Sequence, residues 1–285
     1  MRKVDGLRIS TLLLLLCILG ACSTKTTIKE NDLSFSDYQI DTVSHLFNDT
    51  TKPACHFELN MNYPSVAQNE EQLTKIQKLF VTDYFGEKYE SKSPVEAANA
   101  YMKEYLENYR QLEEDYATFS KDEEGVISTA WMNYQESSNS KILYNRDHFL
   151  SYAITLYTYT GGAHGMQSQM NHVIDLNNVY PLSLSDIFNE NNLNNIATLI
   201  IKQIAKDRGY ENPAQLNEDG FFSIEEVQPT DNFLIDESGM TWVYNPYEIA
   251  VYAAGPITVS VEWEELKPYI REDSSVLRLA DESFS

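Results

Sequence analysis

The sequence predicts an α+β protein in which antiparallel sheets carry helices packed on one face, arranged as two consecutive modules. Two observations support this class. Several runs of residues alternate apolar and polar side chains, which is typical of half-buried strands, and they follow one another with short turns between them. Other segments repeat apolar residues at helical spacing and begin at residues that cap helices well. Consecutive strands favour an antiparallel meander over a doubly wound α/β fold.

The first half of the chain contains four predicted strands and two predicted helices. The clearest strand alternates Cys55, Phe57 and Leu59 and ends at Tyr63-Pro64. A helix is expected to begin near Asn69, and another after Ser93, where proline occupies the first helical position. We expect strands over 55–62, 127–131, 142–144 and 150–156, and helices over 70–80 and 94–119.

The second half repeats this organisation. A glycine-containing break over 161–165 is followed by a returning strand, and an amphipathic helix is closed by Gly209 as a C-terminal stop. A hairpin is expected around Asp236–Gly239, because glycine suits the positive φ that tight hairpin loops need. We expect strands over 167–176, 233–235, 240–244 and 257–263, a helical corner at 184–188, and helices over 193–208 and 264–270.

Composition and charge limit which kinds of partner the protein can bind. The chain has 285 residues, of which 42% are hydrophobic and 12% aromatic, so most of it can bury a core and is not disordered. Lysine and arginine number 21 against 43 aspartates and glutamates, a net charge of −22. Nucleic acid is excluded as a partner, because phosphate contacts need a basic face. A cationic partner would be attracted, although self-repulsion of a soluble surface explains the charge equally well.

The N-terminus has the pattern of a bacterial lipoprotein signal. Arg2, Lys3 and Arg8 precede a short apolar stretch over 11–19. Leu19-Gly20-Ala21-Cys22 resembles a lipobox, in which the cysteine receives a thioether-linked lipid. We therefore expect a signal peptide at 1–21, a lipid anchor and tether at 22–49, and attachment to a membrane outside the cytoplasm. A plain secretory signal cleaved after Ala21 is the alternative.

Removal of residues 1–21 would leave a net charge of −24, because that segment carries three basic groups and one acidic group. Ser23 after the lipidated cysteine is compatible with an outer-membrane location in a cell with two membranes. Cys55 would then be the one unmodified cysteine, so no internal disulfide is expected. Its place in an alternating run favours a buried strand position over a reactive thiol.

Five ordered segments carry a resemblance to known domains. Residues 159–165 read Tyr-Thr-Gly-Gly-Ala-His-Gly and are followed, about 20 residues later, by 182–188. The segments 233–240, 244–250 and 252–256 complete the series. In this order they resemble the paired extracytoplasmic domains DUF4163 and DUF3298, over roughly residues 50 to 270. The resemblance places a DUF4163-like α+β module at 50–165 and a DUF3298-like α+β module at 166–285.

The resemblance implies that the protein is a binding protein and not an enzyme. Such modules form the lysozyme-binding ectodomain of an anti-sigma factor, precede the catalytic domain of a peptidoglycan deacetylase, and occur alone as lipoproteins. We expect neither sigma-factor signalling nor deacetylation here, because the sequence shows no sigma-binding segment, no spanning helix and no deacetylase domain. The function that the resemblance still implies for this chain is recognition of a cell-wall enzyme or of the cell wall itself.

Signatures of catalysis and metal binding are missing from the sequence. It has no His-Glu-x-x-His, no paired cysteine motif, no phosphate loop and no Gly-x-Ser-x-Gly. His164 and His172 flank a glycine turn, but two histidines lack a third ligand. We therefore expect no enzyme activity, no metal and no cofactor.

Two loops are the candidate binding sites, although both also have a structural explanation. Glycines allow positive φ and close strand approach, and an Asn-Pro turn is a stable corner. The candidate binding residues are Gly161, Gly162, His164, Gly165, Asn245, Tyr247 and Glu248.

The first functional hypothesis is an acidic lipoprotein that captures lysozyme or another cationic cell-wall enzyme. The alternative is direct binding of peptidoglycan or another wall glycan, for which the 19 tyrosines supply sugar-stacking rings. A cryptic hydrolase that uses His164 and Glu248 is the weakest alternative.

Overall fold

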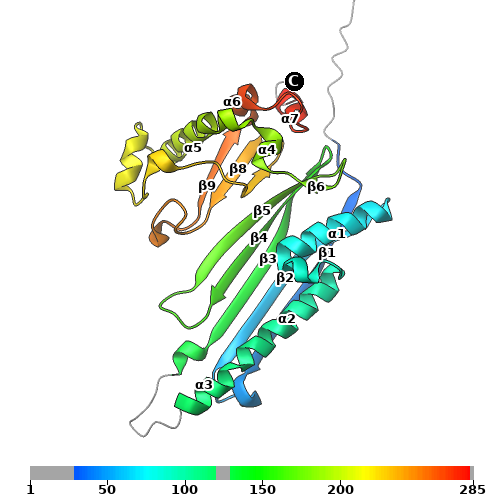
Figure 1. Ribbon diagram of the computed structural model, residues 1–285, viewed down its shortest axis with the longest axis vertical. Coiled ribbons are helices and arrows are strands. Elements are labelled where there is room, and N and C mark those ends of the chain that lie inside the picture. Colours follow the sequence, from blue (N-terminus) through cyan, green and yellow to red (C-terminus); the bar gives the residue numbers. More distant parts are fainter. Residues whose placement is uncertain (1–28, 120–128, 283–285) are drawn as a thin grey trace, which may run out of the picture.

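Two β-sheets form the framework of the protein, and the computed structural model describes residues 29–119 and 129–282. The larger sheet has the strand order β1-β2-β3-β4-β5-β6, and the smaller has the order β7-β8-β9. The larger sheet runs along the molecule, and the smaller lies against its upper end (Figure 1). The strands of the larger sheet are β1 (Leu33–His45), β2 (Ala54–Ala67), β3 (Tyr134–Arg146), β4 (Phe149–Tyr159), β5 (Met166–Asp175) and β6 (Tyr180–Pro181).

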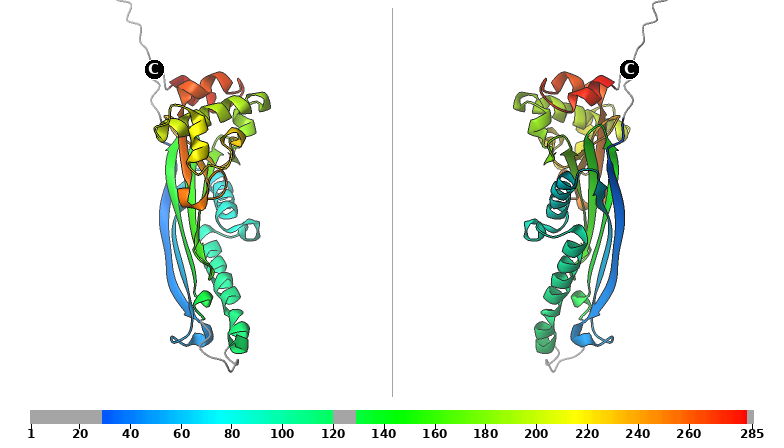
Figure 2. Two further views of the ribbon diagram at one scale, coloured as in Figure 1. Left: turned by 90° about the vertical axis from the view of Figure 1, so that its left-hand side faces the viewer. Right: turned by 90° about the vertical axis from the view of Figure 1, so that its right-hand side faces the viewer.

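Three helices cover one face of the larger sheet (Figure 2). The side chain of Asn69 caps the first helix by accepting a hydrogen bond from the Gln72 amide at 3.0 Å. Ser93 and Glu96 form a capping box at the start of the second. The alternating residues of β2 point toward these helices and are buried, as predicted. The helices are α1 (Glu70–Phe85), α2 (Pro94–Arg110) and α3 (Leu112–Phe119).

The sheets are antiparallel except at one pair. β2 and β3 run in the same direction, from the pair Cys55 and Tyr134 to the pair Asn60 and Asn139. The chain between them passes through all three helices, and such a crossover returns the next strand in parallel. The predicted α+β class with antiparallel sheets and helices on one face is confirmed, with this local exception.

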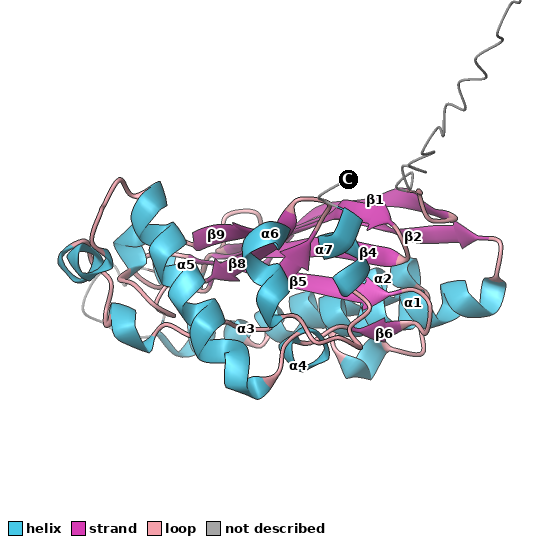
Figure 3. Cartoon of the chain, turned by 90° about the horizontal axis from the view of Figure 1, so that it is seen from above, coloured by secondary structure: helices cyan, strands magenta, loops and turns pink. Residues whose placement is uncertain are grey.

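The second half of the chain builds the smaller sheet and its helices, which cover it when seen from above (Figure 3). The predicted hairpin is present, and Asp236 Oδ1 accepts hydrogen bonds from the amides of Ser238 (2.7 Å) and Gly239 (3.1 Å). The positive φ expected at Gly239 is not found; glycine is needed there because a Cβ would lie 2.1 Å from the carbonyl oxygen of Val261. Gly209 has φ 76° directly after the long helix, as its predicted stop role requires. The elements are α4 (Leu184–Ile187), α5 (Leu193–Asp207), β7 (Phe233–Ile235), β8 (Gly239–Tyr244), β9 (Ile257–Glu262), α6 (Trp263–Leu266) and α7 (Leu277–Glu282).

The two halves share a hydrophobic core. Tyr144, Phe149 and Val173 of the larger sheet belong to the same buried cluster as Trp242 and Trp263 of the smaller half. A buried hydroxyl also joins the sheets, because Ser151 Oγ donates to the carbonyl of Ile235 at 2.7 Å. The two halves therefore form one packed body in which their relative position is fixed by side chains.

Three expectations differ from the structure. The predicted tether at 22–49 is too long, because residues 33–45 form β1 and pair with β2; Cys22 itself lies outside the described residues. The predicted boundary at 165/166 falls at the tip of the β4–β5 hairpin, whereas the change of sheet comes after Pro181. The strand expected over 127–131 is a 3-10 turn at Ala130–Met132, and its first two residues are not described.

Cys55 is buried on β2, as predicted. Burial, with a smaller contribution from the nearby Glu136 carboxylate, raises the pKa of the Cys55 thiol to about 12. The thiol is therefore protonated and unreactive at neutral pH. In the part of the chain that the structure describes, no helix has the length and apolar character needed to span a bilayer.

Candidate functional site

The glycine loop between β4 and β5 is shaped by close contacts. Gly161 has φ 84°, and a Cβ at this position would lie 1.7 Å from the carbonyl oxygen of Trp131. At Gly165 a Cβ would lie 2.3 Å from the hydroxyl of Tyr157. Gly162 is not crowded, since its nearest contact would be at 3.7 Å. Gly161 and Gly165 thus have a structural role in letting the hairpin fold back on the chain, whereas Gly162 does not.

Replacing Gly161 by alanine is expected to lower the stability by roughly 1–2 kcal/mol or more, because an L-residue is strained in the left-handed region and its Cβ meets backbone. Gly162→Ala is the matched control, one residue away and without either problem. Thermal unfolding followed by circular dichroism measures both. Equal midpoints for the two variants would contradict this structural role.

The two candidate loops meet through an aromatic residue that was not predicted as part of the site. The ring of His164 stacks on Tyr252 at a centroid distance of 4.2 Å, and Tyr247 lies 5.5 Å from Tyr252 on centroids. The Tyr252 hydroxyl donates to the carbonyl of Gly165 at 2.7 Å. We call His164, Tyr247 and Tyr252 the aromatic shelf. These contacts bring the two candidate loops together, which the sequence did not predict.

Tyr247 is held in an unusual backbone conformation. Its φ is 72°, and 51% of the residue is exposed. A bulky residue with positive φ is rare and costs conformational energy that the surrounding structure must offset. The adjacent Asn245 and Glu248 supply that support, because the Glu248 carboxylate accepts from the Asn245 amide at 2.9 Å.

Asn245 attaches this turn to the free edge of β5. Its Oδ1 accepts from the amide of Gln169 at 2.7 Å, and its Nδ2 donates to the Gln169 carbonyl at 3.1 Å. The side-chain amide thus makes the two hydrogen bonds that a neighbouring strand would make. Asn245 and Glu248, both predicted as binding residues, therefore have structural roles.

An acidic groove adjoins the aromatic shelf. Two hollows of about 640 and 420 Å³ share Asp231 and Glu248 as lining residues, and Glu226 lines the larger one. Among the described residues that line them, none is a lysine or an arginine. Phe222, 56% exposed, lies at the larger hollow. We call these two hollows together the acidic groove; it suits cationic or hydrogen-bond-donating groups.

A buried polar cluster lies next to the smaller hollow. His172 Nδ1 is 3.3 Å from Asp83 Oδ2, and the Tyr152 hydroxyl donates to the same carboxylate. Burial raises the pKa of Asp83 and lowers the pKa of His172, which leaves the imidazole neutral at pH 7. The Nε2 atom of His172 is buried without a partner in the described structure.

The histidines are used separately. His164 stacks on the aromatic shelf, whereas His172 pairs with Asp83 of α1, so the hairpin does not bring them to a common ligand. Across the described segments, no group of three or more histidine, cysteine, aspartate or glutamate side chains is arranged to hold a metal ion.

Several residues of this region could not be predicted as functional from the sequence. Glu226 and Asp231 lie in an irregular segment with no periodic pattern, and only the fold places them beside Glu248. Tyr252 lies in a segment that carried the family resemblance, and that was the one available signal for it.

Two family models match the chain. The model described as "Deacetylase PdaC" matches residues 50–167, and the model described as "Protein of unknown function (DUF3298)" matches residues 185–264. His164 therefore comes from the first match, and Tyr247, Tyr252 and the three groove carboxylates come from the second. No curated protein matches the chain.

Solved structures show the same fold. A DUF3298 family protein from Pseudomonas aeruginosa PAO1 is similar at 14% identity and a TM-score of 0.55, over 85% of this chain and 96% of that one. A member of the DUF3298 family from Bacteroides fragilis NCTC 9343 has 30% identity and a TM-score of 0.81, over 90% of this chain and 98% of that one. The extent of this second similarity, together with the matching family model, shows that the chain belongs to the DUF3298 family.

Proposed function

We propose that the protein is a binding module of the cell envelope that captures a cationic cell-wall enzyme such as a lysozyme. The observation that carries the proposal is the acidic groove, with three carboxylates and no lysine or arginine among its described lining residues. Arginine and lysine side chains of a basic enzyme complement such a groove. The net charge of −22 adds long-range attraction and speeds association.

The aromatic shelf gives the groove a second means of binding cations. The exposed ring of Tyr247 lies beside the groove, since its chain neighbour Glu248 lines both hollows. A cation over an exposed tyrosine ring gains about 0.5–1 kcal/mol. The strained backbone of Tyr247 supports a role in display, because strain of this kind gathers at functional positions.

The proposal includes the anchor. Cleavage before Cys22 and lipidation of its thiol would hold the protein outside the cytoplasm with the described body a short chain away.

The N-terminal half of the protein is then the DUF4163-like module of the domain pair that the sequence resembles. A match to a model named for a deacetylase does not bring that activity to this chain, and we propose that it acts without catalysis. The hydrolase candidates His164 and Glu248 are engaged in stacking and in a turn.

The test is titration calorimetry of the protein from Ser23 onward against a cationic lysozyme. Two salt concentrations are used: about 150 mM, where the Debye length is roughly 8 Å, and about 500 mM, where it is much shorter and attraction between exposed charges is more strongly screened. We expect saturable 1:1 binding at both. Heat that disappears at the higher salt would mean unspecific attraction and would refute capture. A muramidase assay on the same mixture separates inhibition from simple capture.

Two variants locate the contact. Glu226→Gln and Tyr247→Ala change exposed side chains of the groove and of the shelf. Loss of a charged hydrogen bond, which contributes roughly 1.5–3 kcal/mol, should weaken binding by Glu226→Gln at least about tenfold. Loss of a cation–π contact, which contributes about 0.5–1 kcal/mol, should weaken binding by Tyr247→Ala about two- to fivefold. Glu272→Gln removes the same charge at an exposed position outside the groove and is the matched control. If all three variants bound alike, the groove would not be the contact surface.

Direct binding of a wall glycan is the second candidate, and the aromatic shelf is the observation that favours it. Sugars stack on exposed aromatic rings and hydrogen-bond to side-chain amides and carboxylates. Titration with soluble peptidoglycan fragments distinguishes the two partners. Glycan binding would be abolished by Tyr247→Ala and barely changed by Glu226→Gln, whereas capture of a cationic enzyme depends on both.

A further inference from the structure

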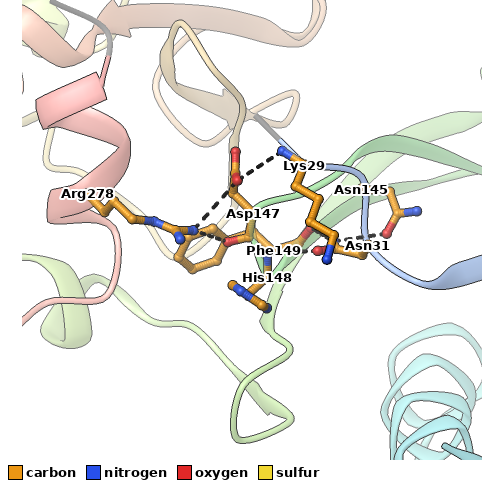
Figure 4. A network of polar contacts seen from close by, with 7 residues as sticks. All are labelled: Lys29, Asn31, Asn145, Asp147, His148, Phe149 and Arg278. Atoms are coloured by element: carbon orange, nitrogen blue, oxygen red, sulfur yellow. Dashed lines mark hydrogen bonds and ion pairs between the residues drawn. The ribbon is translucent and has the colours of Figure 1, made fainter. Parts of the chain in front are cut away.

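A separate cavity lies at the end of the larger sheet where the described chain begins. Its volume is about 660 Å³, within the range of small-molecule sites, and it shares no lining residue with the acidic groove. Its walls come from the first residues of the described chain, the β3–β4 turn, the start of α1 and the C-terminal helix α7. Figure 4 shows the polar contacts at its centre.

Asp147 is the central residue of this cavity. It forms the β3–β4 turn with His148, and both have positive φ, 51° and 66°, as two-residue hairpin loops require. The Lys29 amide donates to Asp147 Oδ1 at 3.2 Å, and Arg278 Nη2 donates to the Asp147 backbone carbonyl at 2.6 Å. These contacts fix the carboxyl group where Lys29, the β3–β4 turn and α7 meet.

One oxygen of that carboxyl group has no partner. Asp147 is only 7% exposed, and its Oδ2 is buried without a hydrogen bond in the described structure. An unpaired buried acceptor costs about 1–3 kcal/mol, so this oxygen is a place for an N–H donor from a ligand. A single free oxygen suits an ammonium group better than a divalent metal, which needs several oxygen ligands.

Positive charge lies beside this acceptor. The guanidinium of Arg278 is 3.9 Å from Asp147 Oδ1 and its side chain is 43% exposed, so it also has donors directed to solvent. Lys29 is a second basic residue in the cavity wall. Two further carboxylates line the cavity, and both have partners: Glu30 lies 3.8 Å from Arg146, and Asp32 Oδ2 accepts from the Gln68 amide at 3.1 Å. Leu33 and Leu176 are apolar residues of the lining. A ligand would therefore meet an acceptor for its cationic end at Asp147 and the Arg278 guanidinium for its anionic end.

We propose that this cavity binds a zwitterion in which a primary ammonium group lies a few bonds from a phosphate, with the ammonium at Asp147 Oδ2 and the phosphate at Arg278. Arginine is well suited to phosphate because its planar fork makes two parallel hydrogen bonds. The same chemistry occurs in soluble phosphoethanolamine and in the headgroup of an ethanolamine phospholipid. The lipid source rests on the proposed lipidation of Cys22, which would place Lys29, seven residues on, within about 25 Å of the bilayer.

The test is titration of phosphoethanolamine into the protein from Ser23 onward, as wild type and as Asp147→Asn. Asparagine adopts the left-handed conformation readily and keeps an oxygen for the Lys29 amide, so the turn is preserved. We expect saturable binding by the wild type and at least about tenfold weaker binding by the variant, because a charge-assisted hydrogen bond is lost. Ethanolamine alone and inorganic phosphate alone should each bind more weakly than the zwitterion.

The matched control is Asp115→Asn, which makes the same charge change at an exposed position on α3, at the other end of the molecule (Figure 1). It should bind phosphoethanolamine as the wild type does. Circular dichroism of Asp147→Asn confirms that any loss is not unfolding. Absence of wild-type binding, or equal binding by Asp147→Asn, would overturn the proposal and leave a cavity that holds only water.

Vesicles identify the source of the ligand. Phosphatidylcholine vesicles are compared with vesicles that also contain phosphatidylethanolamine, and bound protein is measured by co-sedimentation. Retention that needs phosphatidylethanolamine and is lost in Asp147→Asn supports the membrane headgroup. Binding of soluble phosphoethanolamine without vesicle retention supports the same site with a soluble ligand.

Discussion

Glu136→Gln is expected to make the protein more stable than the wild type above pH 7 and to remove a fall in stability that the wild type shows between about pH 4.5 and 7. Glu136 lies on β3 within the larger sheet and is 3% exposed. It is covered by α2, from which Tyr101 hydrogen-bonds to its carboxylate. Burial raises the pKa of Glu136 from 4.5 to about 7, and the Tyr101 contact opposes this only in part.

The direction of this pH dependence is set by whether the folded or the unfolded state binds the Glu136 proton more tightly. Below pH 4.5 the carboxyl is protonated in the folded and unfolded states alike, and burial of the neutral group has its smallest cost. Between the two pKa values only the folded state holds the proton, so raising the pH favours unfolding. A shift from 4.5 to about 7 corresponds to a loss of roughly 3 kcal/mol once the pH exceeds 7.

Urea unfolding of both proteins at pH 5 and pH 8 measures this difference. The free energy of unfolding of Glu136→Gln should exceed that of the wild type by more at pH 8 than at pH 5, because glutamine has no charge to bury. Glu211→Gln, at an exposed position, is the matched control and should follow the wild type at both values. Parallel pH dependence of wild type and Glu136→Gln would show that Glu136 has no raised pKa.

The local elements of the fold could be predicted because their signals are local. Asn69 and Ser93 mark helix starts through hydrogen bonds to amides within one turn, and Gly209 marks a helix end through its positive φ. The alternation of β2 follows from one buried face. The sequence does not predict β1, because most of its residues are only partly buried and its hydrophobic alternation is weak.

What could not be predicted depends on contacts far apart in the sequence. The parallel pairing of β2 and β3 is set by the path of three helices, and no local pattern records it. Glu136 lies in a polar stretch of β3 that gives no sign of burial, yet α2 covers it. The two candidate loops were found separately as glycine and Asn-Pro turns. Their meeting through Tyr252 needed the fold.

The junction of the two halves leads to the second large expected effect. Asn232, just before β7, bridges the edge of β5 and β8 with its side chain. Its Oδ1 accepts from the Asn171 amide at 2.8 Å, and its Nδ2 donates to the carbonyls of Gln169 and Val243, both at 2.9 Å. With Asn245 on the same stretch of β5, it closes a strand edge that would otherwise leave unpaired backbone groups.

Asn232→Ala is expected to lower the free energy of unfolding by about 2–3 kcal/mol, because three hydrogen bonds are lost and partly buried backbone groups are left unpaired. Asn232→Asp should lower it further, since a carboxylate oxygen would replace Nδ2 against two carbonyl oxygens. Asn194→Ala, at an exposed position on α5, is the control and should have little effect.

Urea unfolding measures the free energy of unfolding of each variant. Hydrogen exchange shows where the structure is weakened, and the backbone amide of Asn171 should lose protection first. Because Asn232 also lines the smaller hollow of the acidic groove, its loss should weaken partner binding as well. Unchanged protection at Asn171 in a destabilised variant would mean that Asn232 supports β8 alone and that the two sheets are held together by their shared core.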